Sequence, residues 1–151
     1  MSIPANRKDL LFSIRYLGKL LSLDFDKRLS EHGLTCQQGR LLFYINRMET
    51  ELNQEVHQND IENEFHLSKS TVSGLIKRME KRGVVTVSKK HQYAVINVTD
   101  EGREILLSVR HARDELSSQL KNEIGEDGYE QLITSLEKLI NCMKGEKEDD
   151  K

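Results

Sequence analysis

Apolar residues recur every three or four positions over most of the chain, which is the spacing of one face of an α-helix. Residues 7–31 keep this pattern without interruption and predict one long amphipathic helix. Residues 32–35, "HGLT", end it. Thr35 and Gln38 then have the spacing of a capping box, so a second helix, whose apolar residues repeat through Met48, should begin after Thr35.

A polar stretch and a short helix come next. Residues 49–56, "ETELNQEV", are polar and predict a loop. Residues 58–65, "QNDIENEF", favour a short helix with its two apolar side chains pointing inward. After the turn at "HLS", Ser68 is a favourable N-cap for a helix over 69–82, and Gly83 stands where a C-terminal glycine belongs.

β-branched residues replace the helical pattern after Gly83. Two such runs, "VVTVS" and "YAVINV", flank residues 89–92, "KKHQ". β-branched side chains favour strands, and a four-residue connection fits a hairpin. The sequence therefore predicts a small two-stranded hairpin directly after the helix over 69–82.

Helical periodicity returns after the hairpin and lasts almost to the end of the chain. Thr99 is a favourable N-cap for this segment, which we expect to be interrupted at Gly125 and Gly128. The predicted helices occupy residues 100–144. Residues 145–151, "GEKEDDK", have nothing to bury and are predicted to be disordered.

The helix over 69–82 has two sharply different faces. At about 100° per residue, one sector collects its large apolar side chains, which are Val72, Leu75, Ile76 and Met79. The opposite sector collects small, hydroxylated and cationic residues, which are Ser70, Gly74, Lys77 and Lys81, flanked by Thr71, Ser73 and Arg78. Small residues allow close approach, and hydroxyls and cations bind phosphates and base edges, so this face suits a DNA major groove.

Charge is segregated onto the same part of the chain. The whole chain has a formal net charge of −2, but residues 66–93 hold seven Lys and Arg and one acid, which leaves the remainder strongly acidic. A basic segment in an acidic protein is typical of a local polyanion site. The alternative is a solvated helix face on which cations cluster by chance.

Two long motifs resemble a known family. The stretch "VHQNDIENEFHLSKSTVSGLIKRMEKRGVVTVSKK", followed by "VINVTDEGREIL", is similar to the MarR family of winged-helix transcriptional regulators. "GLTCQQGRLLFYI" resembles that family's segment leading into its second helix. The resemblance implies a mainly α fold with a small β-hairpin wing, in which a winged helix-turn-helix core at 34–99 lies between dimerisation helices at 7–31 and 100–144 of a single domain.

The family resemblance also implies a function. The implied protein is a sequence-specific DNA-binding transcription regulator, usually a repressor. It would bind a pseudo-palindromic operator in double-stranded DNA as a homodimer and be released by a small-molecule or redox signal. The pattern itself supports the dimer, because the N- and C-terminal helices carry more apolar surface than so small a core can cover. The alternative function is a helical dimeric protein-interaction module, but protein interfaces are depleted in lysine.

By the same resemblance, DNA contacts fall on the helix and on the wing. The residues so implied are Ser68, Lys69, Ser70, Thr71, Ser73, Gly74, Lys77, Arg78 and Lys81 on the helix, and Lys89, Lys90 and His91 at the wing tip. Two positions depart from the family. Many members have an arginine at the position of Gly74, and the short wing "SKKHQYAV" lacks the family's Asp–Arg combination, whose planar guanidinium a lysine does not reproduce.

Four residues are candidates for sensing a signal. Tyr16, Phe25 and Tyr44 lie on the first two predicted helices, where related regulators bind small aromatic effectors; core packing is the alternative for each. Cys36 stands one residue into a predicted helix, whose dipole would lower the thiol pKa and favour redox sensing. The alternative is that Cys36 packs as a small buried hydrophobic residue.

Other classes of chemistry leave no signature. The five histidines share no metal-ligand spacing, and the chain has no catalytic motif or phosphate-binding glycine loop, so we expect neither an enzyme nor a cofactor. No apolar run is long enough to span a membrane, and the first residues do not read as a secretory signal. With only two distant cysteines, these features predict a cytoplasmic protein.

Overall fold

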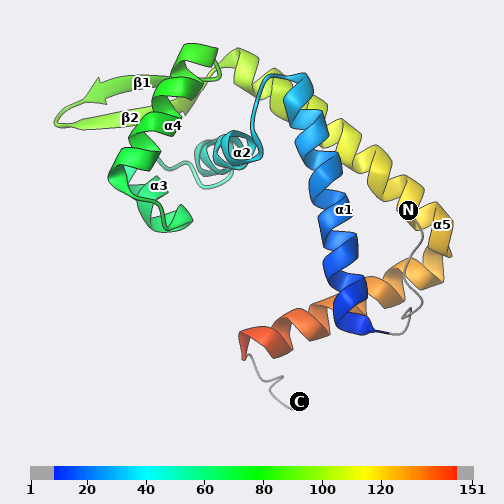
Figure 1. Cartoon of the computed structure of the whole chain (residues 1–151). Coiled ribbons are helices and arrows are strands. Elements are labelled where there is room, and N and C mark those ends of the chain that lie inside the picture. Colours follow the sequence, from blue (N-terminus) through cyan, green and yellow to red (C-terminus); the bar gives the residue numbers. More distant parts are fainter. Residues whose placement is uncertain (1–8, 146–151) are drawn as a thin grey trace. The chain divides into compact units, whose positions relative to one another are not determined.

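The computed structural model describes residues 9–145. Within that range the chain forms helices and one antiparallel hairpin (Figure 1), which confirms the predicted mainly α, winged-helix fold class. In chain order the elements are α1 (Leu10–Glu31), α2 (Cys36–Thr50), α3 (Gln58–Phe65), α4 (Lys69–Arg82), β1 (Val85–Lys90), β2 (Tyr93–Val98) and α5 (Asp100–Lys144). The chain divides within α5 into two compact units, Met1–Arg110 and His111–Lys151.

Side-chain caps set the ends of the helices in the first unit. At the start of α2, the Thr35 hydroxyl accepts from the Gln38 amide N–H at 3.2 Å while the Gln38 side chain accepts from the Thr35 N–H at 3.0 Å, which is the predicted capping box. Ser68 caps α4 by accepting from the Thr71 N–H. Gly83 ends α4 with a φ of 85°, a conformation that favours glycine, as predicted.

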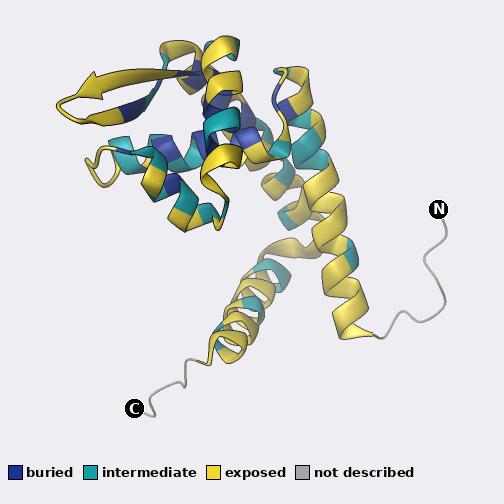
Figure 2. Cartoon of the chain, turned by 60° about the vertical axis from the view of Figure 1, so that its left-hand side comes forward, coloured by how far each residue is buried: buried dark blue, intermediate teal, exposed yellow. Residues whose placement is uncertain are grey.

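The hydrophobic core is confined to one part of the described chain. Every buried residue of 9–145 lies between Leu29 and Val109 (Figure 2), so the core joins the end of α1, helices α2 to α4, the hairpin and the first turns of α5. The four apolar residues predicted to face inward on α4 are all buried. Burial of this face fixes the opposite face of α4 toward the outside of the unit.

The hairpin is longer than predicted and its connection is shorter. Lys89 and Lys90 continue β1 and pair with Ala94 and Tyr93, which leaves only residues 91–92 as the turn. The prediction of a four-residue connection is therefore wrong. His91 has a φ of 59°, as the first residue of a tight two-residue hairpin turn requires, and this turn lets the ladder run past the β-branched residues.

The polar stretch after α2 is more structured than a loop. Helix α2 extends to Thr50, and Val56 is fully buried in an isolated antiparallel bridge in which its carbonyl accepts from the Ile96 N–H at 2.9 Å. The Glu49 carboxylate accepts from the Val98 N–H at 3.0 Å and from the Asn97 side chain at 2.9 Å. These contacts join the end of α2 and its loop to the inner strand of the hairpin.

The boundaries of the outer helices also differ from the prediction. Helix α1 begins at Leu10 because the Asp9 carboxylate accepts from two amide groups of its first turn; the predicted residues 7 and 8 lie outside the described range. In α5, Gly125 has non-helical angles (φ 77°, ψ 167°), as expected of a break, but Gly128 is helical. The predicted interruption at Gly128 is wrong. The tail predicted as disordered lies outside the described residues from 146 onward.

Candidate nucleic-acid interface

The outward face of α4 is open. Ser70, Lys77 and Lys81 are exposed, and Gly74 is partly exposed between them. A Cβ placed on Gly74 would meet only the end of the Arg78 side chain, at 3.4 Å, so no other segment within residues 9–145 covers this part of the helix. The face predicted to approach DNA is therefore sterically available.

Three hydroxyl groups cluster at the start of α4. The Ser68 Oγ lies 3.2 Å from the Ser70 Oγ and 2.8 Å from the Thr71 Oγ1, and it also accepts from the Thr71 amide. Ser68 is thus engaged in capping the helix, whereas Ser70 and Thr71 are exposed beside it. Hydroxyls next to the free amide groups of a helix N-terminus form a surface that favours anionic groups.

The cations of α4 divide into two sets. Lys77, Arg78 and Lys81 are exposed, and among residues 9–145 none of them takes part in an ion pair. Arg82 instead turns inward: its guanidinium donates to the His32 carbonyl at 2.7 and 3.2 Å and to the Glu101 carboxylate at 2.7 Å. Arg82 therefore fastens α4 to neighbouring segments, and the basic charge available to a ligand is smaller than the residue count suggests.

The wing carries less free charge than predicted. Lys89 and His91 are exposed, but the Lys90 ammonium pairs with the Glu55 carboxylate. Sequence reasoning missed Glu55 because it lies outside the basic stretch and in a segment that looked like an ordinary polar loop. No periodic signal could have connected two surface residues so far apart in the chain.

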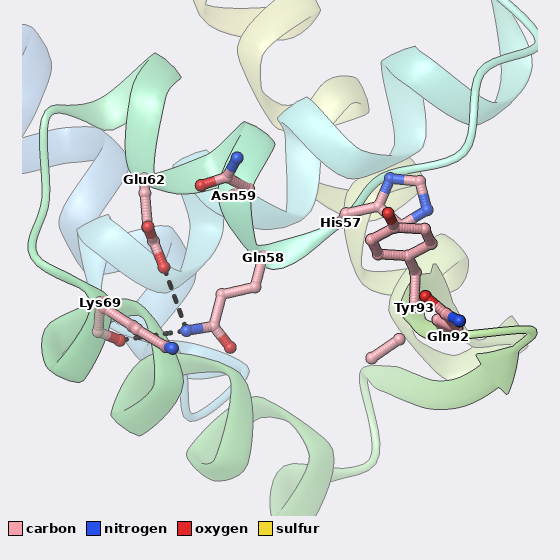
Figure 3. Close-up of a pocket in the computed structure, with 8 residues that line it drawn as sticks. His57, Gln58, Asn59, Glu62, Lys69, Gln92 and Tyr93 are labelled. Carbon is pink, nitrogen blue, oxygen red and sulfur yellow. Dashed lines mark hydrogen bonds between the residues drawn. The ribbon is translucent and has the colours of Figure 1, made fainter.

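An open pocket of about 290 Å³ lies between the start of α3, Lys69 at the start of α4 and the strand β2 (Figure 3). The Gln58 amide donates to the Glu62 carboxylate at 3.1 Å and to the Lys69 carbonyl at 3.2 Å, so it bridges α3 and α4. On the other side the His57 ring meets the Tyr93 ring edge-on, with centroids 5.8 Å apart. The Gln58 bridge therefore joins α3 to α4, and the His57–Tyr93 contact joins the start of α3 to the wing.

The three aromatic effector candidates have different ring neighbours. Tyr16 stacks on Phe12 within α1, with ring centroids 5.7 Å apart. The other two belong to separate contacts at the edge of the core, since Phe25 lies 6.1 Å from Phe43 and Tyr44 lies 5.5 Å from Phe65. Burial, reinforced by the charges of Glu64 and Asp60, raises the pKa of Tyr44.

The environment of Cys36 opposes the pKa shift expected from its place near a helix start. Burial raises the pKa of the Cys36 thiol, the Asp26 carboxylate adds to the rise through a hydrogen bond and its charge, and Arg40 opposes it. Burial and an acidic neighbour therefore favour the protonated thiol, which is opposite in direction to the lowered pKa that redox sensing would require. Cys142 is exposed.

Residues 9–145 contain neither a metal-binding cluster nor a membrane-spanning helix. The His, Cys, Asp and Glu side chains of that range form no group of three or more that could hold a metal ion. No helix in the same range combines the length and apolar character needed to cross a bilayer.

Comparison with known proteins finds a family model that matches part of the chain. Residues 32–92, which cover α2 to α4 and the first strand of the wing, match the model of the MarR family. This region of the chain is therefore similar to the MarR family. A curated relative, the HTH-type transcriptional regulator BilQ of Clostridioides difficile (strain CD3), is 26% identical over 132 residues, which span 85% of this chain and 86% of BilQ.

Solved structures of a transcription regulator share the fold. The crystal structure of MepR, a transcription regulator of the Staphylococcus aureus multidrug efflux pump MepA, aligns with a TM-score of 0.78 at 21% identity and covers 89% of this chain and 98% of MepR. The S. aureus MepR–DNA complex aligns with a TM-score of 0.67 at 21% identity, covering 92% and 99% of the two chains. The likeness therefore extends beyond the winged helix to most of both chains.

Proposed function

We propose that this chain is a MarR-family transcription regulator that binds double-stranded DNA through the outward face of α4. The observation that carries the proposal is the open surface formed by Ser70, Gly74 and Lys77, held outward by a buried apolar face. Hydroxyls and a glycine near the N-terminus of a helix suit base edges, and the lysines further along suit phosphates. The named function of BilQ and the DNA complex of MepR support the same role.

The regulator acts as a homodimer. Large apolar side chains remain uncovered on α1 and on α5; Leu11 is 71% exposed and Met143 is 88% exposed. Exposed apolar patches of this kind mark association surfaces. A second copy of the chain supplies the same two helices, and the resulting pair of α4 helices can meet half-sites one helical turn, about 34 Å, apart.

Repression and release by a small molecule complete the proposal. An effector that changes the spacing of the two α4 helices would misalign one of them with its half-site. Tyr16, Phe25 and Tyr44 stay the candidates for contact with an aromatic effector. The raised pKa of Cys36 favours the small-molecule signal over the redox signal.

Variants on the two parts of the α4 face test this function. Fluorescence anisotropy should be measured over a salt series on a duplex that the wild-type protein selects from a random pool, and on a random duplex. Because a dimer carries two copies of Lys77, Lys77→Ala should weaken both complexes and reduce the salt slope by about 1.8, which is about 0.9 for each lost phosphate contact. Ser70→Ala should cost about 1–3 kcal/mol for each half-site on the selected duplex and little on the random one.

Lys138→Ala, an exposed lysine of α5, is the matched control and should leave both affinities unchanged. If Lys77→Ala and Ser70→Ala bind both duplexes as the wild type does, α4 is not the recognition helix. If the wild-type protein selects no duplex at all, the alternative of a protein-interaction module replaces DNA binding.

A further inference from the structure

An acidic residue lies at the wing of this otherwise basic surface. Glu55 belongs to the segment between α2 and α3, and its carboxylate pairs with the Lys90 ammonium on β1. Lys90 is the last residue of its strand and pairs with Tyr93 across the ladder. The ion pair therefore joins the outer end of the wing to the segment that precedes α3.

The two residues after Glu55 contact the wing as well. Val56 bridges to Ile96 through its backbone, and the His57 ring meets the Tyr93 ring edge-on (Figure 3). Glu55 and its two neighbours thus hold the hairpin through an ion pair, a backbone hydrogen bond and a ring contact. The Glu55 Oε2 also lies 3.8 Å from the His57 Nε2, but among the groups in these contacts Lys90 is the one with a permanent positive charge that DNA would attract.

The Glu55 carboxylate can be replaced by another anion on Lys90, because the pair is exposed. The Lys90 side chain is 63% exposed and that of Glu55 is 46% exposed, and ion pairs in such positions contribute little stability. The hydrogen bond from Lys90, with its charge, lowers the pKa of Glu55, so the carboxylate is ionised at neutral pH. A DNA phosphate presents Lys90 with an anion of the same kind as the carboxylate it already holds.

We propose that Glu55 acts as an internal substitute for a DNA phosphate, which holds Lys90 and the wing in the free protein and is displaced when DNA binds. This inference rests on the proposed DNA-binding function. It predicts that Lys90 contributes less to duplex affinity than an unpaired lysine would. The reason is that Lys90 must give up its ion pair with Glu55 before it can bind a DNA phosphate. Lys89, which has no ion pair among the described residues, contributes fully.

A double-mutant cycle on the intact protein tests this exchange. Duplex affinity is measured by anisotropy at fixed salt for wild type, Glu55→Gln, Lys90→Gln and the double variant, with thermal unfolding to confirm that each is folded. Glu55→Gln should bind about two- to fivefold more tightly than wild type for each wing that contacts the duplex, the range expected for the loss of one exposed ion pair. In the Lys90→Gln background the same change should have little effect, because no ammonium is left to release.

Glu51→Gln is the matched control, since it makes the same change of net charge a few residues away, where the carboxylate pairs with Arg47 of α2. Its affinity should equal that of wild type. Equal gains from Glu51→Gln and Glu55→Gln, or a gain from Glu55→Gln that persists without Lys90, would overturn the exchange and leave only a general charge effect. Weaker binding by Glu55→Gln would overturn it too, because the wing would then need the pair when bound.

The two proposals fail in different ways. A wild-type protein that binds no duplex overturns both the function and the exchange. Binding that depends on Lys77 but shows no coupling between Glu55 and Lys90 overturns the exchange alone.

Discussion

The two ends of helix α5 have the same kind of sequence but opposite environments. Its first turns contribute Ile105, Leu106 and Val109 to the core, each less than 7% exposed. From residue 111 to residue 144 no residue is buried, although Ile133, Leu136 and Ile140 repeat at helical spacing. An amphipathic pattern therefore predicts that a helix has an apolar face, but it does not predict which partner covers that face.

Helix α1 also has one buried and one exposed end, but here the first apolar residues are exposed and the last is buried. Leu29, near its end, is fully buried against the winged helix, whereas Leu10, Leu11 and Leu17 are about half exposed or more. Apolar side chains that keep helical spacing without burial in their own chain suit a surface completed by another chain. The winged helix is self-sufficient, and the helices beyond it are not.

The largest effect is expected from substitutions on the exposed part of α5 that should dissociate the proposed homodimer. Ile133→Glu with Ile140→Glu places two carboxylates on the apolar face and should raise the free energy of the dimer by roughly 3 kcal/mol or more, since an unpaired charge in an interface is costly. Sedimentation equilibrium should then detect monomers. Because the substitutions lie outside the core, circular dichroism of the winged helix should be retained.

Gln131→Glu with Lys138→Glu is the matched control, with the same spacing on the opposite face of the helix. It should sediment as the wild type does. A dimer that survives the isoleucine substitutions would place the association surface elsewhere.

A smaller effect is expected when a glycine inside the core and a glycine outside it are each replaced by alanine. In the core, a Cβ on Gly102 would lie 2.4 Å from the Val84 carbonyl and 2.8 Å from Val98, so Gly102→Ala should lower the free energy of unfolding by about 1–3 kcal/mol. Beyond the core, a Cβ on Gly128 meets only Ile124, at 3.5 Å. Gly128→Ala should stabilise α5 by roughly 0.5–1 kcal/mol, because alanine favours the helix. Urea unfolding measures both, and equal effects would contradict the difference in packing.

The smallest effect compares the two cysteines, one in each unit. With iodoacetamide at about pH 8, Cys36 should react several-fold more slowly than exposed Cys142, because burial and Asp26 keep its thiol protonated. Its rate should increase as the pH rises toward its raised pKa. Mass spectrometry of Cys36→Ser and Cys142→Ser separates the two rates, and faster modification of Cys36 would restore it as a redox candidate.

The sequence predicted those parts of the fold that depend on local chemistry. The capping box of Thr35 and Gln38, the cap at Ser68, the left-handed Gly83 and the buried face of α4 follow from short-range spacing, and all are confirmed. Gly128 shows the limit of such rules, since it is helical only three residues after the break at Gly125, although local propensity disfavours glycine in a helix.

Contacts between distant polar residues were not predictable in the same way. Glu55 with Lys90, Glu49 with Arg103 and Arg82 with the His32 carbonyl each join positions more than thirty residues apart. Polar surface residues have no periodicity that reveals such partners, and the same limit concealed the strand character of Lys89 and Lys90. The predicted DNA-contact residues of α4 remain a prediction that binding experiments must test.

Photo-cross-linking from α4 tests the central claim most directly. In a Cys36→Ser, Cys142→Ser background, Lys77→Cys and Glu137→Cys are each labelled with a benzophenone and irradiated with a selected duplex. A probe at Lys77 should cross-link to the duplex in high yield, and one at Glu137 should not. Cross-linking from Glu137 alone, or from neither position while the duplex is bound, would contradict the assignment of α4 as the DNA-binding surface.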